Sequence, residues 1–326
     1  MLEHGGRLLA AAQQYGIPVA DWIDLSTGIN PNGWPVPAIP THCWQRLPEQ
    51  EDGLLAAARQ YYQAENLLAV AGSQAAIQTL PLLRSCSKVG VLTPAYAEHA
   101  ASWQKAGHQL VTLTPDTIAE TIPELDVLIL INPNNPSGVS FSKEQLLDWH
   151  VQLQSRAGWL IVDEAFIDVN PVQSLTSLPV RDGLIILRSV GKFFGLAGIR
   201  CGFVIADQQL LNALDEKLGV WPISHPGRYV ATQALLDEHW QQQTRRELPL
   251  QSERLRQLLT SHQLKPNGSN ALFQWCKTPS AASIHQHLAE FGILTRLFSQ
   301  PESLRFGLPK HEAQWQGLEQ TLKKIF

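Results

Sequence analysis

The chain has 326 residues, of which 44% are hydrophobic and 17% charged, and its net charge is −4. This composition excludes a disordered chain, and the charge gives no reason to expect nucleic acid or a membrane as a partner. No apolar run approaches the ~18 residues of a membrane span and the first residues lack a secretory signal, so we expect a cytoplasmic protein. The four cysteines lie far apart, with no C-x-x-C pair and no histidine at ligand spacing. We therefore expect reduced thiols, no disulfides and no metal site.

The first 40 residues predict a short helix over residues 6–15 and then a proline-rich arm over residues 29–40. From residue 53 onward, helices and strands alternate. The predicted helices cover residues 54–62, 74–83, 95–106, 143–155 and 208–218, and the predicted strands cover residues 67–71, 88–92, 109–113, 127–131, 159–162, 184–187 and 202–205. Such alternation of helices with near-continuous apolar strands predicts an α/β fold with a mostly parallel sheet covered by helices on both faces.

The last third of the chain predicts a smaller α+β unit. A long helical stretch covers residues 229–262, and the predicted elements that follow are strands at 271–276, 293–296 and 304–306 and helices at 282–291 and from 311. We therefore expect an N-terminal helix and arm over residues 1–40, a large domain over residues 41–220 and a small C-terminal domain over residues 221–326.

Lys192 is the first candidate for chemistry, because it follows the apolar run Leu184–Leu187. Partial desolvation at the end of a buried strand lowers the pKa of a lysine amine and favours its role as an imine-forming nucleophile. Ser189, three residues earlier, and Arg200, eight residues later, supply a hydroxyl and a guanidinium that suit a dianionic phosphate. A lysine beside a phosphate grip is what pyridoxal phosphate (PLP) requires; a surface lysine in a glycine-rich loop is the alternative.

Four further clusters follow or lie within predicted strands, and open α/β sheets bind ligands where strands end. Gly72 and Ser73 lead into a helix, as in an anion cradle or an ordinary N-cap. The loop at residues 132–138, Asn-Pro-Asn-Asn-Pro-Ser-Gly, faces a ligand or forms a structural turn. Asp163 closes an apolar strand and needs a cationic partner, either a protonated pyridine nitrogen or a local arginine. Arg305 suits a substrate carboxylate, or is a partly exposed strand residue.

The order and spacing of these clusters resemble the fold-type I PLP enzymes, in the aminotransferase branch near the histidinol-phosphate aminotransferases. The resemblance implies that Lys192 binds the cofactor as an imine, that Asp163 faces the pyridine nitrogen, that Asn135 contacts the ring hydroxyl and that Tyr96 stacks on the ring. The other cofactor-binding residues that it implies are Gly72, Ser73, Gln74, Ser189 and Arg200, of which Ser73, Ser189 and Arg200 hold the phosphate. For the substrate it implies Arg305 at the α-carboxylate, together with Asn135, Ile29 and His4, the last as a candidate for the substrate phosphate.

Two departures from that branch narrow the resemblance. Phe166 stands where the histidinol-phosphate aminotransferases have a tyrosine, and Leu47 replaces the tyrosine that contacts the neighbouring subunit's cofactor phosphate. The His4-Gly-Gly motif and residues 24–31, 71–78 and 163–168 instead resemble the threonine-phosphate decarboxylases of cobalamin biosynthesis. That resemblance implies a homodimer acting on a small phosphorylated amino acid.

Three hypotheses for the function stay open at this point. The first is PLP-dependent decarboxylation of L-threonine-O-3-phosphate to (R)-1-amino-2-propanol phosphate. The second is transamination of histidinol phosphate or a related amino acid, and the third is a PLP-binding protein without catalysis. The motifs do not decide between the first two hypotheses, because the same residues serve both reactions. The complete set of residues argues against the third, because a protein that only binds PLP does not need all of them.

Overall fold

The computed structural model describes residues 4–326, and the chain divides into two compact units. The large unit comprises residues 34–135 and 140–242. The small unit combines the N-terminal residues up to Gly33 with residues 136–139 and 243–326. The N-terminal segment therefore folds with the C-terminal part of the chain.

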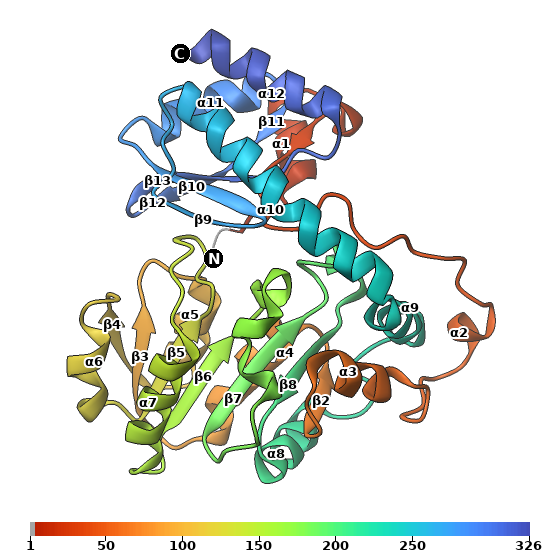
Figure 1. Ribbon diagram of the computed structural model, residues 1–326, viewed down its shortest axis with the longest axis vertical. Coiled ribbons are helices and arrows are strands. Elements are labelled where there is room, and N and C mark those ends of the chain that lie inside the picture. Colours follow the sequence, from red (N-terminus) through yellow and green to blue (C-terminus); the bar gives the residue numbers. More distant parts are fainter. Residues whose placement is uncertain (1–3) are drawn as a thin grey trace. The chain divides into compact units, whose positions relative to one another are not determined.

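The large unit is built on a seven-stranded sheet with the order β2-β8-β7-β6-β5-β3-β4 (Figure 1). The strands are β2 Leu67–Val70, β3 Lys88–Leu92, β4 Gln109–Leu113, β5 Val127–Ile131, β6 Trp159–Asp163, β7 Leu184–Ser189 and β8 Gly202–Ile205. The strands from β4 to β7 pair in parallel, and β8 is antiparallel to both of its neighbours. This sheet confirms the predicted α/β fold class.

Helices cover both faces of this sheet (Figure 1). Every residue of β5 is buried, which requires cover on both sides because successive strand residues point to opposite faces. One face packs against α4, α5 and α8 through Ile77, Trp103 and Leu211, and α7 contacts β6. The helices of this unit are α2 His42–Gln45, α3 Leu54–Tyr62, α4 Ser73–Thr79, α5 Ala97–Lys105, α6 Ile118–Thr121, α7 Lys143–Gln154, α8 Gln208–Leu218 and α9 His225–Leu236.

The small unit contains an antiparallel sheet with the order β12-β13-β10-β9 and a short parallel pair of β1 and β11. Phe273 and Phe306 are fully buried in it. Its strands are β1 Ile23–Asp24, β9 Gly268–Asn270, β10 Phe273–Lys277, β11 Ile293–Leu294, β12 Arg296–Ser299 and β13 Glu302–Gly307, and its helices are α1 Leu8–Tyr15, α11 Ala281–Glu290 and α12 Glu312–Ile325. A further helix, α10 Glu238–Ser261, begins in the large unit and belongs to the small unit from Gln243 onward.

The helical stretch predicted over residues 229–262 is present as two helices, α9 and α10, with a break at Asp237 that was not predicted. The Asp237 carboxylate accepts hydrogen bonds from the Trp240 backbone N–H and the Trp34 indole N–H, both at 3.0 Å. An aspartate side chain that binds a nearby backbone N–H competes with continued helix and favours a new helix start. These hydrogen bonds lower the pKa of Asp237.

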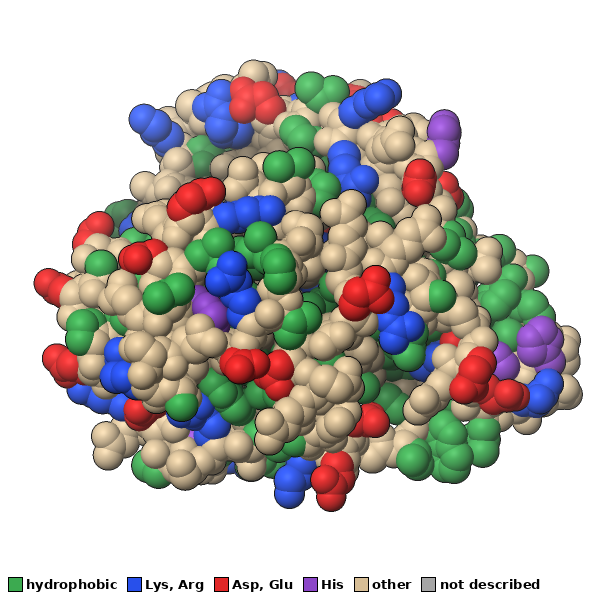
Figure 2. Space-filling model, turned by 60° about the horizontal axis from the view of Figure 1, so that its bottom comes forward, with side chains coloured by type: hydrophobic (Ala, Val, Ile, Leu, Met, Phe, Trp, Pro, Cys, Tyr) green, Lys and Arg blue, Asp and Glu red, His purple; other side chains and the backbone are tan. Residues whose placement is uncertain are grey.

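The surface charge and the helices can be described for residues 4–326. Acidic and basic side chains are interspersed on the face that Figure 2 shows, without a broad patch of one charge. Among the helices of residues 4–326, none combines the length and the apolar character that crossing a membrane requires.

Candidate active site

Three strands of the large unit bring the predicted phosphate-binding segments to one edge of the sheet. Gly202 of β8 pairs with Val70 of β2 on one side and with Ser189 of β7 on the other. The chain continues from β2 into the start of α4, and a Cβ built on Gly202 would lie only 2.6 Å from the Ser73 backbone nitrogen. Ser73 and Ser189 therefore flank the same glycine, and a side chain at position 202 would separate them.

Arg200 completes this group from the turn before β8. A Cβ built on Gly72 would lie 2.6 Å from Nη2 of Arg200, so the guanidinium packs directly on that glycine. Gly72 has φ +68° and ψ 160°, a conformation that is essentially restricted to glycine. Nη1 of Arg200 donates to the Ala197 carbonyl at 3.2 Å, and Ser189 Oγ accepts from the Gly191 N–H at 3.1 Å. One guanidinium, two hydroxyls and a helix-start N–H form a donor set that suits a dianion.

Lys192 lies in the turn that follows β7. Its carbonyl accepts a hydrogen bond from the Gly195 N–H at 3.2 Å, and its side chain is half-buried. Nζ lies 5.6 Å from the ring centroid of the buried Phe166, which follows β6. The Lys192 amine therefore lies beside a buried aromatic ring and is partly enclosed.

Asp163, the last residue of β6, forms a buried pair with His99 of α5. Their Oδ2 and Nε2 atoms are 3.0 Å apart, and each residue is only 4% exposed. Oδ1 accepts from the Ala165 N–H at 3.0 Å. His99 was not predicted from the sequence, because its contact with Asp163 depends on how α5 packs beside the end of β6.

Tyr96, which precedes α5, links this pair to the start of α4. Its hydroxyl donates to Gln74 Oε1 at 3.1 Å, and Gln74 Nε2 donates to Glu98 at 2.9 Å. Burial raises the pKa of Tyr96 to about 12, with further increases from Glu98 and Asp163 and an opposing effect of Arg200. Tyr96 is therefore a neutral phenol that lies within electrostatic range of both Asp163 and Arg200.

The asparagine loop divides into structural and candidate functional residues. Asn132 is buried and exchanges two hydrogen bonds with the Phe141 backbone, at 2.9 and 3.1 Å. Asn134 donates to the Pro94 carbonyl at 2.9 Å. The structural-turn alternative thus applies to these two residues, and the half-buried Asn135 remains the candidate for a ligand contact.

A buried ion cluster lies beside the candidate site in sequence. Arg188 pairs with Glu164 at 2.9 Å and with Asp168, and the three side chains are at most 2% exposed. Burial disfavours the charge of Arg188, but its two carboxylate partners prevail and raise its pKa. Arg188 is the local arginine that could have paired with Asp163, and it pairs with the adjacent Glu164 instead. Successive residues along a strand direction point to opposite sides, so Glu164 points away from the side of Asp163.

Arg305 of β13 is buried in the small unit, 7% exposed, and Nη2 donates to the Ser26 carbonyl at 2.7 Å. The alternative of a partly exposed strand residue is therefore wrong. Arg296 of β12 is its cross-strand partner. The pKa of Arg305 is lowered to about 10, mainly by burial and also by the charge of Arg296, while Asp24 opposes this. Two adjacent guanidiniums repel each other, so this position suits an anionic ligand.

The two other predicted substrate residues, His4 and Ile29, also belong to the small unit, His4 exposed and Ile29 half-buried. The sequence analysis missed Arg296, because its place beside Arg305 depends on strand register.

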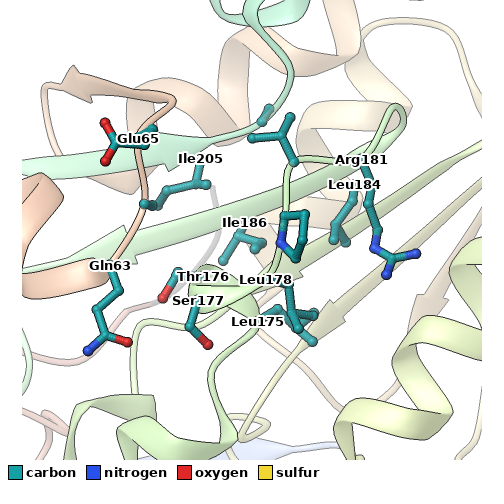
Figure 3. Close-up of a pocket in the computed structure, with 14 residues that line it drawn as sticks. Gln63, Glu65, Leu175, Thr176, Ser177, Leu178, Arg181, Leu184, Ile186 and Ile205 are labelled. Atoms are coloured by element: carbon teal, nitrogen blue, oxygen red, sulfur yellow. The ribbon is translucent and has the colours of Figure 1, made fainter.

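A separate cavity of about 300 Å³ lies in the large unit (Figure 3). It is lined by Leu184 at the start of β7 and Ile205 at the end of β8, whereas Ser189 lies at the opposite end of β7. Glu65 and Arg181 appear on opposite sides of the close-up, with mostly apolar side chains between them (Figure 3). This cavity does not contain any of the predicted site residues.

Comparison with known proteins identifies the family. The model of the family "Aminotransferase class I and II" matches residues 43–316. The chain belongs to this family. It is 53% identical over 322 residues to the threonine-phosphate decarboxylase of Pseudomonas aeruginosa, with 99% of this chain and 97% of that protein covered.

Two further proteins extend the comparison. The threonine-phosphate decarboxylase of a Sinorhizobium species is 37% identical over 336 residues, with 99% of this chain and 98% of that protein covered. The crystal structure of histidinol-phosphate aminotransferase from Sinorhizobium meliloti in complex with pyridoxal-5'-phosphate superposes with a TM-score of 0.85. It is 19% identical and covers 100% of this chain and 96% of that one, so this likeness concerns the fold.

Proposed function

We propose that this class I and II family member is a PLP-dependent decarboxylase of L-threonine-O-3-phosphate in cobalamin biosynthesis. The observation that carries the proposal is the 53% identity, over 99% of the chain, to the threonine-phosphate decarboxylase of Pseudomonas aeruginosa. The product would be (R)-1-amino-2-propanol phosphate, with release of CO₂.

The residues of the large unit fit PLP. Lys192 and Asp163 follow or end the adjacent parallel strands β7 and β6, and Ser73, Ser189 and Arg200 gather where β2, β8 and β7 meet. Lys192 would hold the cofactor through Nζ, and the serine–arginine group would hold its phosphate. Tyr96, with a neutral phenol, would contact the ring face, and Asn135 the ring hydroxyl. When bound, the cofactor supplies an electron sink for the bond that breaks at the substrate Cα.

The buried Asp163 carboxylate would keep a proton on the pyridine nitrogen, because burial of a carboxylate is costly and a nearby cation compensates that cost. His99 would hold that carboxylate in place through the 3.0 Å contact. The Lys192 amine would deliver a proton to Cα after CO₂ has left. Phe166, beside Lys192, offers no hydrogen bond of its own and keeps water from that side of the amine.

The substrate carboxylate would bind Arg305, with Arg296 adding a second positive charge for the substrate's anionic groups. Which bond at Cα breaks depends on which one lies perpendicular to the cofactor ring, since only that bond overlaps the ring's π system. His4 and Ile29 stay candidates for the substrate's remaining contacts.

The proposal is tested by supplying threonine phosphate and histidinol phosphate in parallel, each with and without 2-oxoglutarate. We expect CO₂ from threonine phosphate without any keto acid, and no CO₂ from the Lys192→Ala variant. Consumption of 2-oxoglutarate without CO₂ would support the aminotransferase alternative, and turnover by Lys192→Ala would contradict both.

We also propose that the chain is a homodimer. Four large apolar side chains are exposed on α2, the loop after it and the segment before α9: Trp44, Leu47, Val220 and Trp221, each more than half exposed. These segments are neighbours, because α2 contacts α9. Light scattering should give twice the chain mass, and Leu47→Asp should lower it, whereas Val172→Asp, at an exposed apolar position elsewhere, should not. A monomeric wild type would exclude this part of the proposal.

A further inference from the structure

Three metal-ligating side chains meet in the large unit, apart from the residues assigned to the cofactor. His42, Cys43 and His225 each offer one ligand atom, and these atoms all lie within 4.8 Å of one another. Spacing along the chain does not indicate this cluster, because His225 is far from the other two in sequence. The cluster arises only where α2 packs against α9 in the fold.

The donor set is chemically selective. One thiolate sulfur and two imidazole nitrogens suit Zn²⁺, which binds cysteine and histidine in tetrahedral geometry. Bonds of roughly 2.0–2.3 Å place tetrahedral donors roughly 3.3–3.8 Å apart. The donors of this cluster therefore need to close by roughly 1.5 Å at most. His42 is exposed and can make this movement by side-chain rotation.

The local structure prepares the ligands. Nδ1 of His225 lies 3.3 Å from the Arg46 carbonyl oxygen, so Nδ1–H donates there and the lone pair is on Nε2. Metal-bound histidines typically have this second contact to a carbonyl, which sets the tautomer. The rings of His42 and His225 are 5.7 Å apart in an edge-to-face arrangement. Cys43 is 1% exposed, His225 is half-buried and His42 is exposed, so the cluster reaches the surface of this chain, where water can supply a fourth ligand.

We propose that His42, Cys43 and His225 form a Zn²⁺ site with water as the fourth ligand. The ion would link the start of α2 to the start of α9. The end of the same segment already contacts α9, since Arg228 donates to Asp52 at 2.7 Å and to the Glu49 carbonyl at 3.2 Å. Zinc would therefore attach the start of the segment 42–52 to α9, and Arg228 attaches the end of that segment to the same helix.

The test uses untagged holoenzyme that has been dialysed against a chelator and then equilibrated with zinc chloride. Bound zinc is measured by mass spectrometry, and the Kd by competition with a chromophoric chelator. We expect one zinc per chain, at least 100-fold weaker binding in Cys43→Ser and His225→Gln, and unchanged binding in Cys86→Ser, whose cysteine is exposed elsewhere.

Two further measurements separate ligand loss from misfolding. His42→Ala removes an exposed side chain and should weaken zinc binding at least 10-fold with an unchanged circular dichroism spectrum. With Co²⁺ in place of Zn²⁺, a thiolate-to-cobalt charge-transfer band should appear in the difference spectrum of the wild type and of Cys86→Ser, but not of Cys43→Ser. Wild-type protein that binds no zinc, or zinc binding that survives both Cys43→Ser and His42→Ala, would overturn the proposal.

Discussion

Replacing Gly72 by alanine tests whether Arg200 forms part of a phosphate site. The new Cβ would lie 2.6 Å from Nη2 of Arg200, closer than side chains approach, so the guanidinium would have to move. Gly107→Ala is a matched control in the same unit, because Gly107 also has a positive φ, +89°, but no atom within 4 Å of the added Cβ.

The magnitude has two parts. Placing alanine in the backbone conformation of Gly72 costs about 1–3 kcal/mol, a strain that lowers the free energy of unfolding. Displacing Arg200 removes hydrogen bonds between charged groups, each about 1.5–3 kcal/mol. That range corresponds to about 10- to 150-fold weaker binding of PLP. Gly107→Ala should lower stability without changing the Kd for PLP.

The assay is titration of apoenzyme with PLP and, separately, with pyridoxal, which lacks the phosphate. Gly72→Ala should weaken PLP binding and leave pyridoxal binding nearly unchanged. In an Arg200→Ala background the same substitution should have little further effect on PLP, because the displaced group is already gone. Equal losses for PLP and pyridoxal, or additive losses in the double variant, would refute the assignment of Arg200 to the phosphate.

The remaining predictions concern other charged groups. His99→Phe should lower kcat about 10- to 150-fold with little change in KM, since Asp163 loses a charged hydrogen bond of about 1.5–3 kcal/mol. Steady-state kinetics measure this effect, and an unchanged kcat would contradict the role of His99. Arg188→Met should lower the free energy of unfolding in urea by about 3–5 kcal/mol, because the buried carboxylates of Glu164 and Asp168 lose their partner. A loss below about 1 kcal/mol would argue against this ion pairing. With a pKa of about 10, Arg305 loses its charge as the pH rises above 10, so the substrate KM should rise there. Arg296→Met removes a charge that lowers this pKa and should move the rise in KM to higher pH; an unmoved profile would contradict it.

The residues at the ends of strands could be predicted from the sequence, because an apolar run marks a strand and its last residue marks the sheet edge. Asp163 illustrates this: the run before it predicts both its burial and its need for a partner. Ser189 and Lys192 follow from the same reasoning. Gly202 pairs with Ser189 and lies beside Ser73, so it brings these two serines together. This pairing depends on the antiparallel direction of β8 and was not predictable from spacing along the sequence.

Side-chain partners across elements were the part that sequence could not supply. His99 and Arg296 carry no local signal that separates them from an ordinary helix or strand residue, and their roles arise from the packing of α5 and the pairing of β12 with β13. Asn132 and Asn134 show the opposite error: their residue type suggested ligand contacts, but backbone groups already bind them. The helix break at Asp237 was missed because its carboxylate contact to Trp34 joins residues distant in sequence.

The division of the chain has an evolutionary consequence. The proposed cofactor residues all come from the large unit, whereas Arg305, Arg296, Ile29 and His4 come from the small unit. Under the proposed function, we expect mutations in the small unit to change which amino acid is preferred and to leave the proposed cofactor residues intact. Selection for a new substrate would then act on one part of the chain, and selection for cofactor binding on the other.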